Sequence, residues 1–193
     1  TVVNLATALA QEGKKILVQG VGHVGETLVK YITDEGAKVI VNDINEALLE
    51  ELSKKYGANV VLGNNIYGLD VDIYAPCALG ATINDDTIGQ LKAKVIAGAA
   101  NNQLADEVKH GRLLKEKGIA YAPDFLINAG GIINVYAELE GYGKDEIIRK
   151  TENIYNTTLD IFNLSEQENI TTHRAAFNIA QSRIDARKNE KNK

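Results

Sequence analysis

Short apolar runs alternate with helical patterns along most of the chain. Six runs rich in Val, Ile, Leu, Ala and Tyr predict short strands, at residues 15–19, 38–42, 59–62, 71–75, 94–98 and 118–122. After the first and second runs, apolar residues recur at helical spacing through Glu35 and over residues 46–56. Because parallel strands need a helix or a long connection between them, this alternation indicates an α/β doubly wound parallel sheet with strand order 3-2-1-4-5-6.

Helical patterns also lie at both ends of the chain. Residues 1–11 predict a lead-in helix that ends at Gly13. After Gly131 the strand patterns stop, and three helices are predicted at residues 132–139, 145–164 and 171–187. We therefore expect a sheet domain over residues 1–140 and a C-terminal helical extension over residues 141–193.

The first predicted strand ends directly in a Gly-x-Gly-x-x-Gly motif. Gly20 permits a sharp turn, Gly22 has no Cβ to block a pyrophosphate, and Gly25 lets the next helix lie close to the strand. Asp43 follows the second strand about 20 residues later, where a carboxylate can accept both hydroxyls of an adenosine ribose. The combination predicts a Rossmann fold that binds a dinucleotide, and a tight turn followed by a capping acid is the alternative.

Asp43 also indicates which dinucleotide binds. Its carboxylate would repel a 2′-phosphate, and no arginine follows it in residues 42–45. The sequence therefore favours NAD over NADP.

The segments after the last three strands are rich in small residues and amides. They comprise residues 75–80, 98–103 and 122–131, and in this fold they line the ligand side of the sheet. Asn101 and Asn102 could form an ordinary asparagine turn, and Asn128 could cap the helix that begins near residue 132. Their position after the correct strands favours a role in binding, because amides can both donate to and accept from a carboxamide or a ribose.

Composition narrows the partners and the compartment. A net charge of −5 and a pI near 5.3 argue against a nucleic-acid partner, and no apolar stretch is long enough for a membrane span or a signal peptide. The single cysteine, Cys77, cannot form an internal disulfide, so we expect a cytoplasmic protein. Cys77 is interpreted as a small buried residue and not as a nucleophile. His110 and His173 show no metal-ligand spacing, and we expect no metal.

Together these motifs resemble the Glu/Leu/Phe/Val dehydrogenase family, and most of all its leucine-oxidising members. The match runs from about residue 15 to about residue 186. It rests on residues 20–25, 41–45, 72–80, 96–104 and 121–131. The resemblance implies oxidation of a branched-chain L-amino acid to its 2-oxo acid and ammonia, with hydride transfer to NAD.

The resemblance also implies site residues. Those implied for the cofactor are Gly20, Val21, Gly22, His23, Val24, Gly25, Asp43, Ile44, Cys77, Ala78, Ala99, Asn101 and Asn128. Residues 20–25 would hold the pyrophosphate, Asp43 the adenosine ribose, and residues 75–78 with Asn101 the nicotinamide ribose. Asn128 would contact cofactor or substrate, while Ile132 and Val135, one turn apart, would face an aliphatic substrate side chain.

One part of the family pattern is missing. The family's catalytic lysines and aspartate belong to a preceding domain that residues 1–11 cannot contain, and Lys14 and Lys15 belong to the strand entry. We therefore assign no catalytic residue. We expect the chain to bind NAD and to need a catalytic domain or partner chain for turnover.

Other readings stay open. The chain could be a standalone, truncated or engineered NAD-binding module without catalysis, and a homo-oligomer is one option for its assembly. A complete small reductase ranks last, because we find no suitably placed Tyr-x-x-x-Lys pair.

Overall fold

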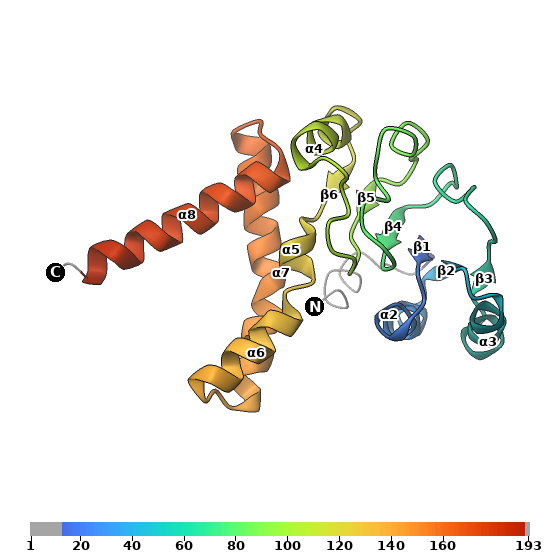
Figure 1. Ribbon diagram of the computed structural model, residues 1–193, viewed down its shortest axis with the longest axis horizontal. Coiled ribbons are helices and arrows are strands. Elements are labelled where there is room, and N and C mark those ends of the chain that lie inside the picture. Colours follow the sequence, from blue (N-terminus) through green and yellow to red (C-terminus); the bar gives the residue numbers. More distant parts are fainter. Residues whose placement is uncertain (1–12, 192–193) are drawn as a thin grey trace.

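The computed structural model describes residues 13–191, so the predicted helix over residues 1–11 lies outside the described residues (Figure 1). The described part contains one parallel sheet with strand order β3-β2-β1-β4-β5-β6, which confirms the predicted topology. The strands are β1 (Lys15–Gln19), β2 (Lys38–Asn42), β3 (Asn59–Val60), β4 (Ile73–Pro76), β5 (Val95–Ile96) and β6 (Ala120–Tyr121).

Helices follow or cover the strands as the pattern predicts, with some changes at the edges. They are α2 (His23–Asp34), α3 (Glu46–Tyr56), α4 (Glu107–Glu116), α5 (Asp124–Ile127), α6 (Gly130–Glu140), α7 (Lys144–Gln167) and α8 (Thr172–Lys191). The connection from β4 to β5 forms turns and bends instead of a helix. Figure 1 shows that α7 runs past the β6 end of the sheet. Helix α8 follows at an angle to α7 and extends away from the sheet.

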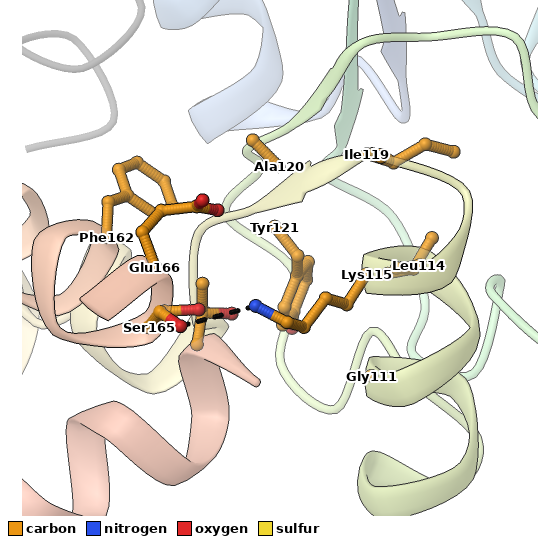
Figure 2. A pocket seen from close by; sticks show the side chains of 11 residues that line it. Gly111, Leu114, Lys115, Ile119, Ala120, Tyr121, Phe162, Ser165 and Glu166 are labelled. Atoms are coloured by element: carbon orange, nitrogen blue, oxygen red, sulfur yellow. Dashed lines mark hydrogen bonds between the residues drawn. The ribbon is translucent and has the colours of Figure 1, made fainter. Parts of the chain in front are cut away.

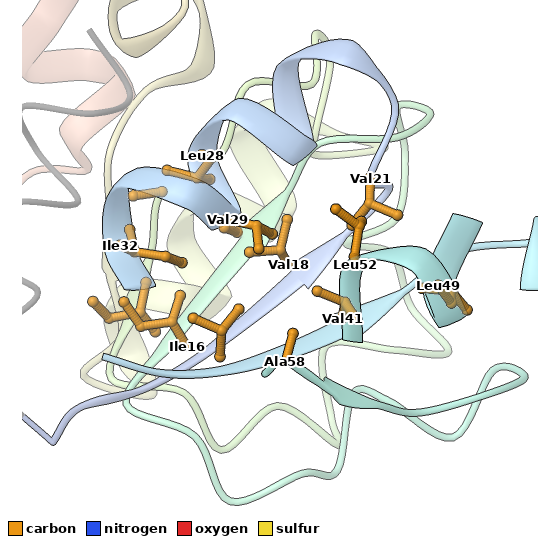
Figure 3. Packing of buried hydrophobic residues seen from close by; sticks show 14 of the residues in the cluster. Ile16, Val18, Val21, Leu28, Val29, Ile32, Val41, Leu49, Leu52 and Ala58 are labelled. Carbon is orange, nitrogen blue, oxygen red and sulfur yellow. The ribbon is translucent and has the colours of Figure 1, made fainter. Parts of the chain in front are cut away.

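Both faces of the sheet are buried, as expected for parallel strands. Ile16 and Val18 of β1 pack with Leu28 of α2 and Leu52 of α3 in one cluster (Figure 3). Leu17, which points to the opposite face, joins a second cluster beneath α4 and the connections between strands. The alternation along β1 therefore fixes which side of the sheet each helix covers.

The bounds of the fourth strand differ slightly from the prediction. The pattern predicts a strand over residues 71–75, whereas β4 runs from Ile73 to Pro76, which pairs with Gln19 and ends the strand. A Cβ added to Gly98 would lie 2.5 Å from the Pro76 nitrogen and 2.1 Å from its carbonyl oxygen. Position 98 therefore requires a residue without a side chain, because the backbone there passes directly against the proline that ends β4.

No helix in residues 13–191 combines the length and the apolar character that crossing a membrane requires.

Candidate functional site

The glycine motif turns the chain sharply between β1 and α2. Gly20 has φ +89°, and a Cβ there would lie 2.5 Å from the Ala78 Cβ. A Cβ on Gly25 would lie 2.0 Å from the Gly20 carbonyl oxygen, which shows how closely the helix approaches the strand end. Gly22, in contrast, has no atom within 4 Å of its added Cβ and leaves open space in front of the helix. Two of the glycines therefore serve packing, and one keeps a surface clear.

The N-terminus of α2 faces that open space with its amides available. Gly22 is the N-cap, and no side chain accepts a hydrogen bond from the first turn. The next two residues, His23 and Val24, are exposed. Glu26 is the one acid in this turn, and its hydrogen bond to Lys55 at 2.8 Å lowers the pKa of its carboxyl. Free N–H groups and the positive helix dipole make this end suited to an anion.

Asp43 is held beside the glycine motif by two backbone amides. Its Oδ2 accepts from the Val21 amide at 2.8 Å, and its Oδ1 accepts from the Asn45 amide at 3.0 Å. A carboxylate has about four acceptor positions, so these two bonds leave capacity for hydroxyl donors. The Asp43 carboxylate is therefore fixed in orientation and can still accept hydrogen bonds from a ligand.

A cleft of about 580 Å³ spans the carboxyl ends of β1, β2 and β4. It is lined by Gln19, Gly20, Gly22, Asn42, Asp43, Ile44, Glu46, Leu62, Gly63, Asn64, Cys77, Ala78 and Leu79. Ile44 and Leu62 leave much of their side chains exposed at its rim, and no lysine or arginine is among the lining residues. The cleft can bind a ligand with both polar and flat apolar parts.

Asn42 closes one side of this cleft. Its Nδ2 donates to the Val61 carbonyl at 2.8 Å and to the Gly63 carbonyl at 3.0 Å. The side chain is buried, so these bonds fix the loop after β3 against the end of β2.

Cys77 and Ala78, which directly follow β4, are among the residues that line the cleft. Burial raises the pKa of the Cys77 thiol to about 11, so the thiol is protonated at neutral pH. This agrees with the interpretation of Cys77 as a packing residue.

The segments after β5 and β6 bring Asn101 and Asn128 together. The Asn128 Nδ2 donates to the Asn101 Oδ1 at 2.5 Å. Asn128 does not cap α6, whose N-cap is Ala129, and it ends the short helix α5 instead. Asn102 has φ +51°, so the turn interpretation describes this residue. Ala99, two residues before Asn101, is partly buried against the core.

Ile132 and Val135 project from α6 with 71% and 57% of their surfaces exposed. They do not line the cleft. The predicted substrate-facing pair is therefore open to solvent in the described chain.

Sequence reasoning missed two buried polar residues behind the asparagine pair. Gln103 is fully buried and folds back onto its own loop, and Asp124 accepts a hydrogen bond from the Gln103 amide at 3.0 Å. The available signal was a polar residue within each of two otherwise small or apolar segments.

A second cavity, of about 220 Å³, lies between α4, β6 and α7 (Figure 2). Lys115 crosses it and donates to the Ser165 carbonyl at 3.2 Å near the end of α7. It is lined by residues 118–121 at the start of β6, so it lies apart from the lining of the large cleft. Within residues 13–191, no three His, Cys, Asp or Glu side chains gather to hold a metal ion.

Comparison with known proteins adds independent findings. A sequence model described as glutamate/leucine/phenylalanine/valine dehydrogenase matches residues 42–191. A leucine dehydrogenase from Bacillus cereus is 51% identical over 180 residues, covering 93% of this chain and 49% of that protein. An L-tryptophan dehydrogenase from Nostoc punctiforme is 46% identical over 182 residues, covering 94% and 52%. The chain thus spans about half the length of these relatives.

Solved dehydrogenase structures are also similar to this chain. The crystal structure of L-tryptophan dehydrogenase from Nostoc punctiforme superposes with a TM-score of 0.91 at 41% identity, covering 96% of this chain and 60% of that one. A hetero-hexameric glutamate dehydrogenase from Thermus thermophilus, at 19% identity and a TM-score of 0.72, shares the fold.

Proposed function

Because the chain belongs to the glutamate/leucine/phenylalanine/valine dehydrogenase family, we propose that it is the NAD-binding part of an amino-acid dehydrogenase. In this proposal residues 13–140 hold the cofactor, and α7 and α8 form an extension to that domain. The observation that carries the proposal is the cleft in which the clear N-terminus of α2 lies beside the oriented Asp43 carboxylate.

The dinucleotide would lie across the carboxyl ends of the strands. Its pyrophosphate would bind the amides of residues 22–24, where Gly22 leaves space for it. Its adenosine ribose would donate to Asp43, and the exposed side chains of Ile44 and Leu62 offer apolar surface for the adenine. A 2′-phosphate would meet Asp43 and Glu46 with no cation among the lining residues, which supports NAD over NADP.

The nicotinamide end would extend past Cys77 and Ala78 toward Asn101 and Asn128. Amide side chains match the hydrogen-bonding needs of a carboxamide and of ribose hydroxyls. The cofactor supplies the hydride acceptor, and these residues would orient its ring and exclude water on one side.

The substrate is proposed to be a branched-chain L-amino acid, as the resemblance to leucine-oxidising relatives implies. Ile132 and Val135 present an apolar face on α6 that could contact an aliphatic side chain. Oxidation also needs a general base and a group that stabilises developing charge, and no lysine lines the cleft among the described residues. We propose that a catalytic domain or partner chain supplies those groups.

The test is a calorimetric titration of NAD and NADP into the purified chain and into Asp43→Asn. We expect NAD to bind, NADP to bind at least about tenfold more weakly, and Asp43→Asn to narrow this difference because the repulsive charge is gone. Asp34→Asn is the matched control, because this exposed acid pairs with Lys30 and lies outside the cleft.

A leucine-dependent assay of NADH absorbance accompanies the titration. We expect no turnover by the chain alone. Failure of NAD to bind would refute the cofactor assignment, and turnover by the chain alone would refute the requirement for a further catalytic part.

A further inference from the structure

Two buried polar side chains connect the loops that follow β5 and β6. The Gln103 Nε2 donates to the Gly98 carbonyl at 2.7 Å and to the Ala100 carbonyl at 3.0 Å. The Gln103 amide in turn donates to the Asp124 Oδ2 at 3.0 Å, and the Asp124 Oδ1 accepts from the Phe125 amide at 2.8 Å. We refer to Gln103 and Asp124 as the loop latch.

The loop after β5 has no large side chain with which to anchor itself. Residues 98–102 read Gly-Ala-Ala-Asn-Asn, so apolar packing alone provides little to fix their position. Gly98 packs against Pro76, and the Ala100 amide donates to the Pro76 carbonyl at 2.9 Å, which fixes the start of the loop. The end of the loop depends on Gln103, whose side chain reaches back to two of the carbonyls.

Burying the polar side chain of Gln103 costs free energy. It is fully buried, and its Oε1 has no hydrogen-bond partner among the described residues. A methionine of similar length would fill the same space but would leave the Gly98 and Ala100 carbonyls without this donor. The glutamine is therefore better explained by what its Nε2 holds in place.

What the loop latch holds is the asparagine pair. Asn101 lies between the two ends that Gln103 and Pro76 fix, and Asn128 ends the short helix α5 that begins at Asp124. The contact between Asn128 Nδ2 and Asn101 Oδ1 joins the same two loops at the surface. The buried loop latch and the exposed asparagine pair thus both connect the loop after β5 to the loop after β6.

A third loop is tied to this arrangement. The Ala81 amide donates to the Asn102 carbonyl at 2.6 Å, and the Ile83 amide donates to the Gln103 carbonyl at 3.0 Å. A Cβ on Gly80 would lie 2.7 Å from the Asn101 carbonyl oxygen. The loops after β4, β5 and β6 therefore form one connected surface, with Gln103 in its buried layer.

We propose that Gln103 and Asp124 are positioning residues that orient Asn101 and Asn128 toward the nicotinamide end of the cofactor. This inference rests on the proposed function. Neither residue touches the ligand in this arrangement, because both are buried behind the loop surface. They act by fixing the backbone from which the two asparagines project.

The experiment compares NAD with ADP, which shares the adenosine and the two phosphates but lacks the nicotinamide and its ribose. Both are titrated by calorimetry into the chain, Gln103→Met and Asp124→Asn. We expect the chain to prefer NAD, Gln103→Met to weaken NAD binding about tenfold, and the affinity for ADP to stay within about twofold. Asp124→Asn keeps one acceptor oxygen, so we expect a smaller loss of NAD affinity in the same direction.

Thr158→Val is the matched control. It removes a buried side-chain donation to the Ile154 carbonyl on α7 and leaves the strand ends untouched. Thermal unfolding of every variant verifies that it is folded, and Asp124→Asn serves in place of Gln103→Met if the latter does not fold. We expect Thr158→Val to change stability without changing the preference for NAD.

The outcomes distinguish a failure of the proposed cofactor binding from a failure of the proposed positioning role. If neither ligand binds the chain, the proposed function fails and the inference fails with it. If ADP binds but NAD binds no more tightly, or if folded latch variants keep the full preference for NAD, the positioning role is refuted while the cofactor assignment stands. Equal losses for both ligands would also refute it, because they would show a general distortion of the cleft.

Discussion

The two halves of the strand edge are held together in different ways. In the first half, the end of β1 and the Asp43 carboxylate are placed by backbone geometry, through the turn at Gly20 and the donation from the Val21 amide. In the second half, buried side chains such as Gln103 reach across to loop carbonyls. The difference teaches that a binding edge can be fixed either from within the backbone or by side chains placed behind it.

The largest effect is expected at two glycines that pack directly against a neighbouring segment of backbone. Gly25→Ala in the first half and Gly98→Ala in the second would place a Cβ within 2.0 and 2.1 Å of a carbonyl oxygen. We expect each to lower the free energy of unfolding by about 3 kcal/mol or more, because backbone cannot move aside cheaply. Urea unfolding measures this.

Gly22→Ala is the matched control for those variants. Its added methyl meets nothing within 4 Å, and the residue has φ −61°, which alanine adopts readily. We expect a stability change within about 1 kcal/mol and a loss of NAD affinity of about tenfold. If Gly22→Ala proved as destabilising as Gly25→Ala, the separation between packing and binding glycines would be wrong.

The next test concerns Cys77, which lies between the two halves at the end of β4. Its pKa of about 11, against an ordinary 9.0, reduces its thiolate fraction near pH 7 about 100-fold, so alkylation by iodoacetamide should be slowed by a similar factor. The rate should rise about tenfold per pH unit up to about pH 11. Since the folded pKa is raised, ionisation of this thiol lowers stability only as pH rises from about 9 to about 11.

Mass spectrometry of the labelled chain follows this reaction, with an unfolded sample as the reference. Saturating NAD should slow labelling further, because Cys77 would lie beneath the cofactor. Rapid labelling of the folded chain at pH 7 would contradict the partly buried, protonated thiol.

The smallest test contrasts two asparagines. Asn42→Ala removes two buried donations to the loop after β3, and we expect a loss of about 1–2 kcal/mol in the free energy of unfolding. Asn128→Ala removes one contact between amides near the surface, and we expect a change within about 0.5 kcal/mol. Thermal unfolding measures both, and equal costs would show that the buried donations of Asn42 stabilise the fold no more than the surface contact of Asn128.

The sequence predicted the fold, and its glycine motif predicted the tight turn found between β1 and α2. Gly20, Gly22, Gly25 and Asp43 act through local geometry, which requires particular residue types at fixed spacing and so leaves a readable motif. The strand order followed from the alternation of strand and helix patterns, and the structure confirms it.

The second half was only partly predictable. Position after β5 and β6 indicated Asn101 and Asn128, but their mutual contact and the burial of Gln103 depend on segments far apart in the chain. The alternative for Asn128, an N-cap of the next helix, does not apply, because Asn128 follows α5 and the N-cap of α6 is Ala129. Side-chain contacts across loops follow no local period, so a single sequence does not display them.

The strand order also has a consequence for how the chain is synthesised. β1, β2 and β3 are consecutive in the chain and adjacent in the sheet, so they can pair as soon as they leave the ribosome. The other edge of β1 must wait until Ile73 arrives to pair with Ile16. During that interval an apolar strand presents an open edge, and the pace of translation through the segment before β4 sets how long the nascent chain is exposed to aggregation.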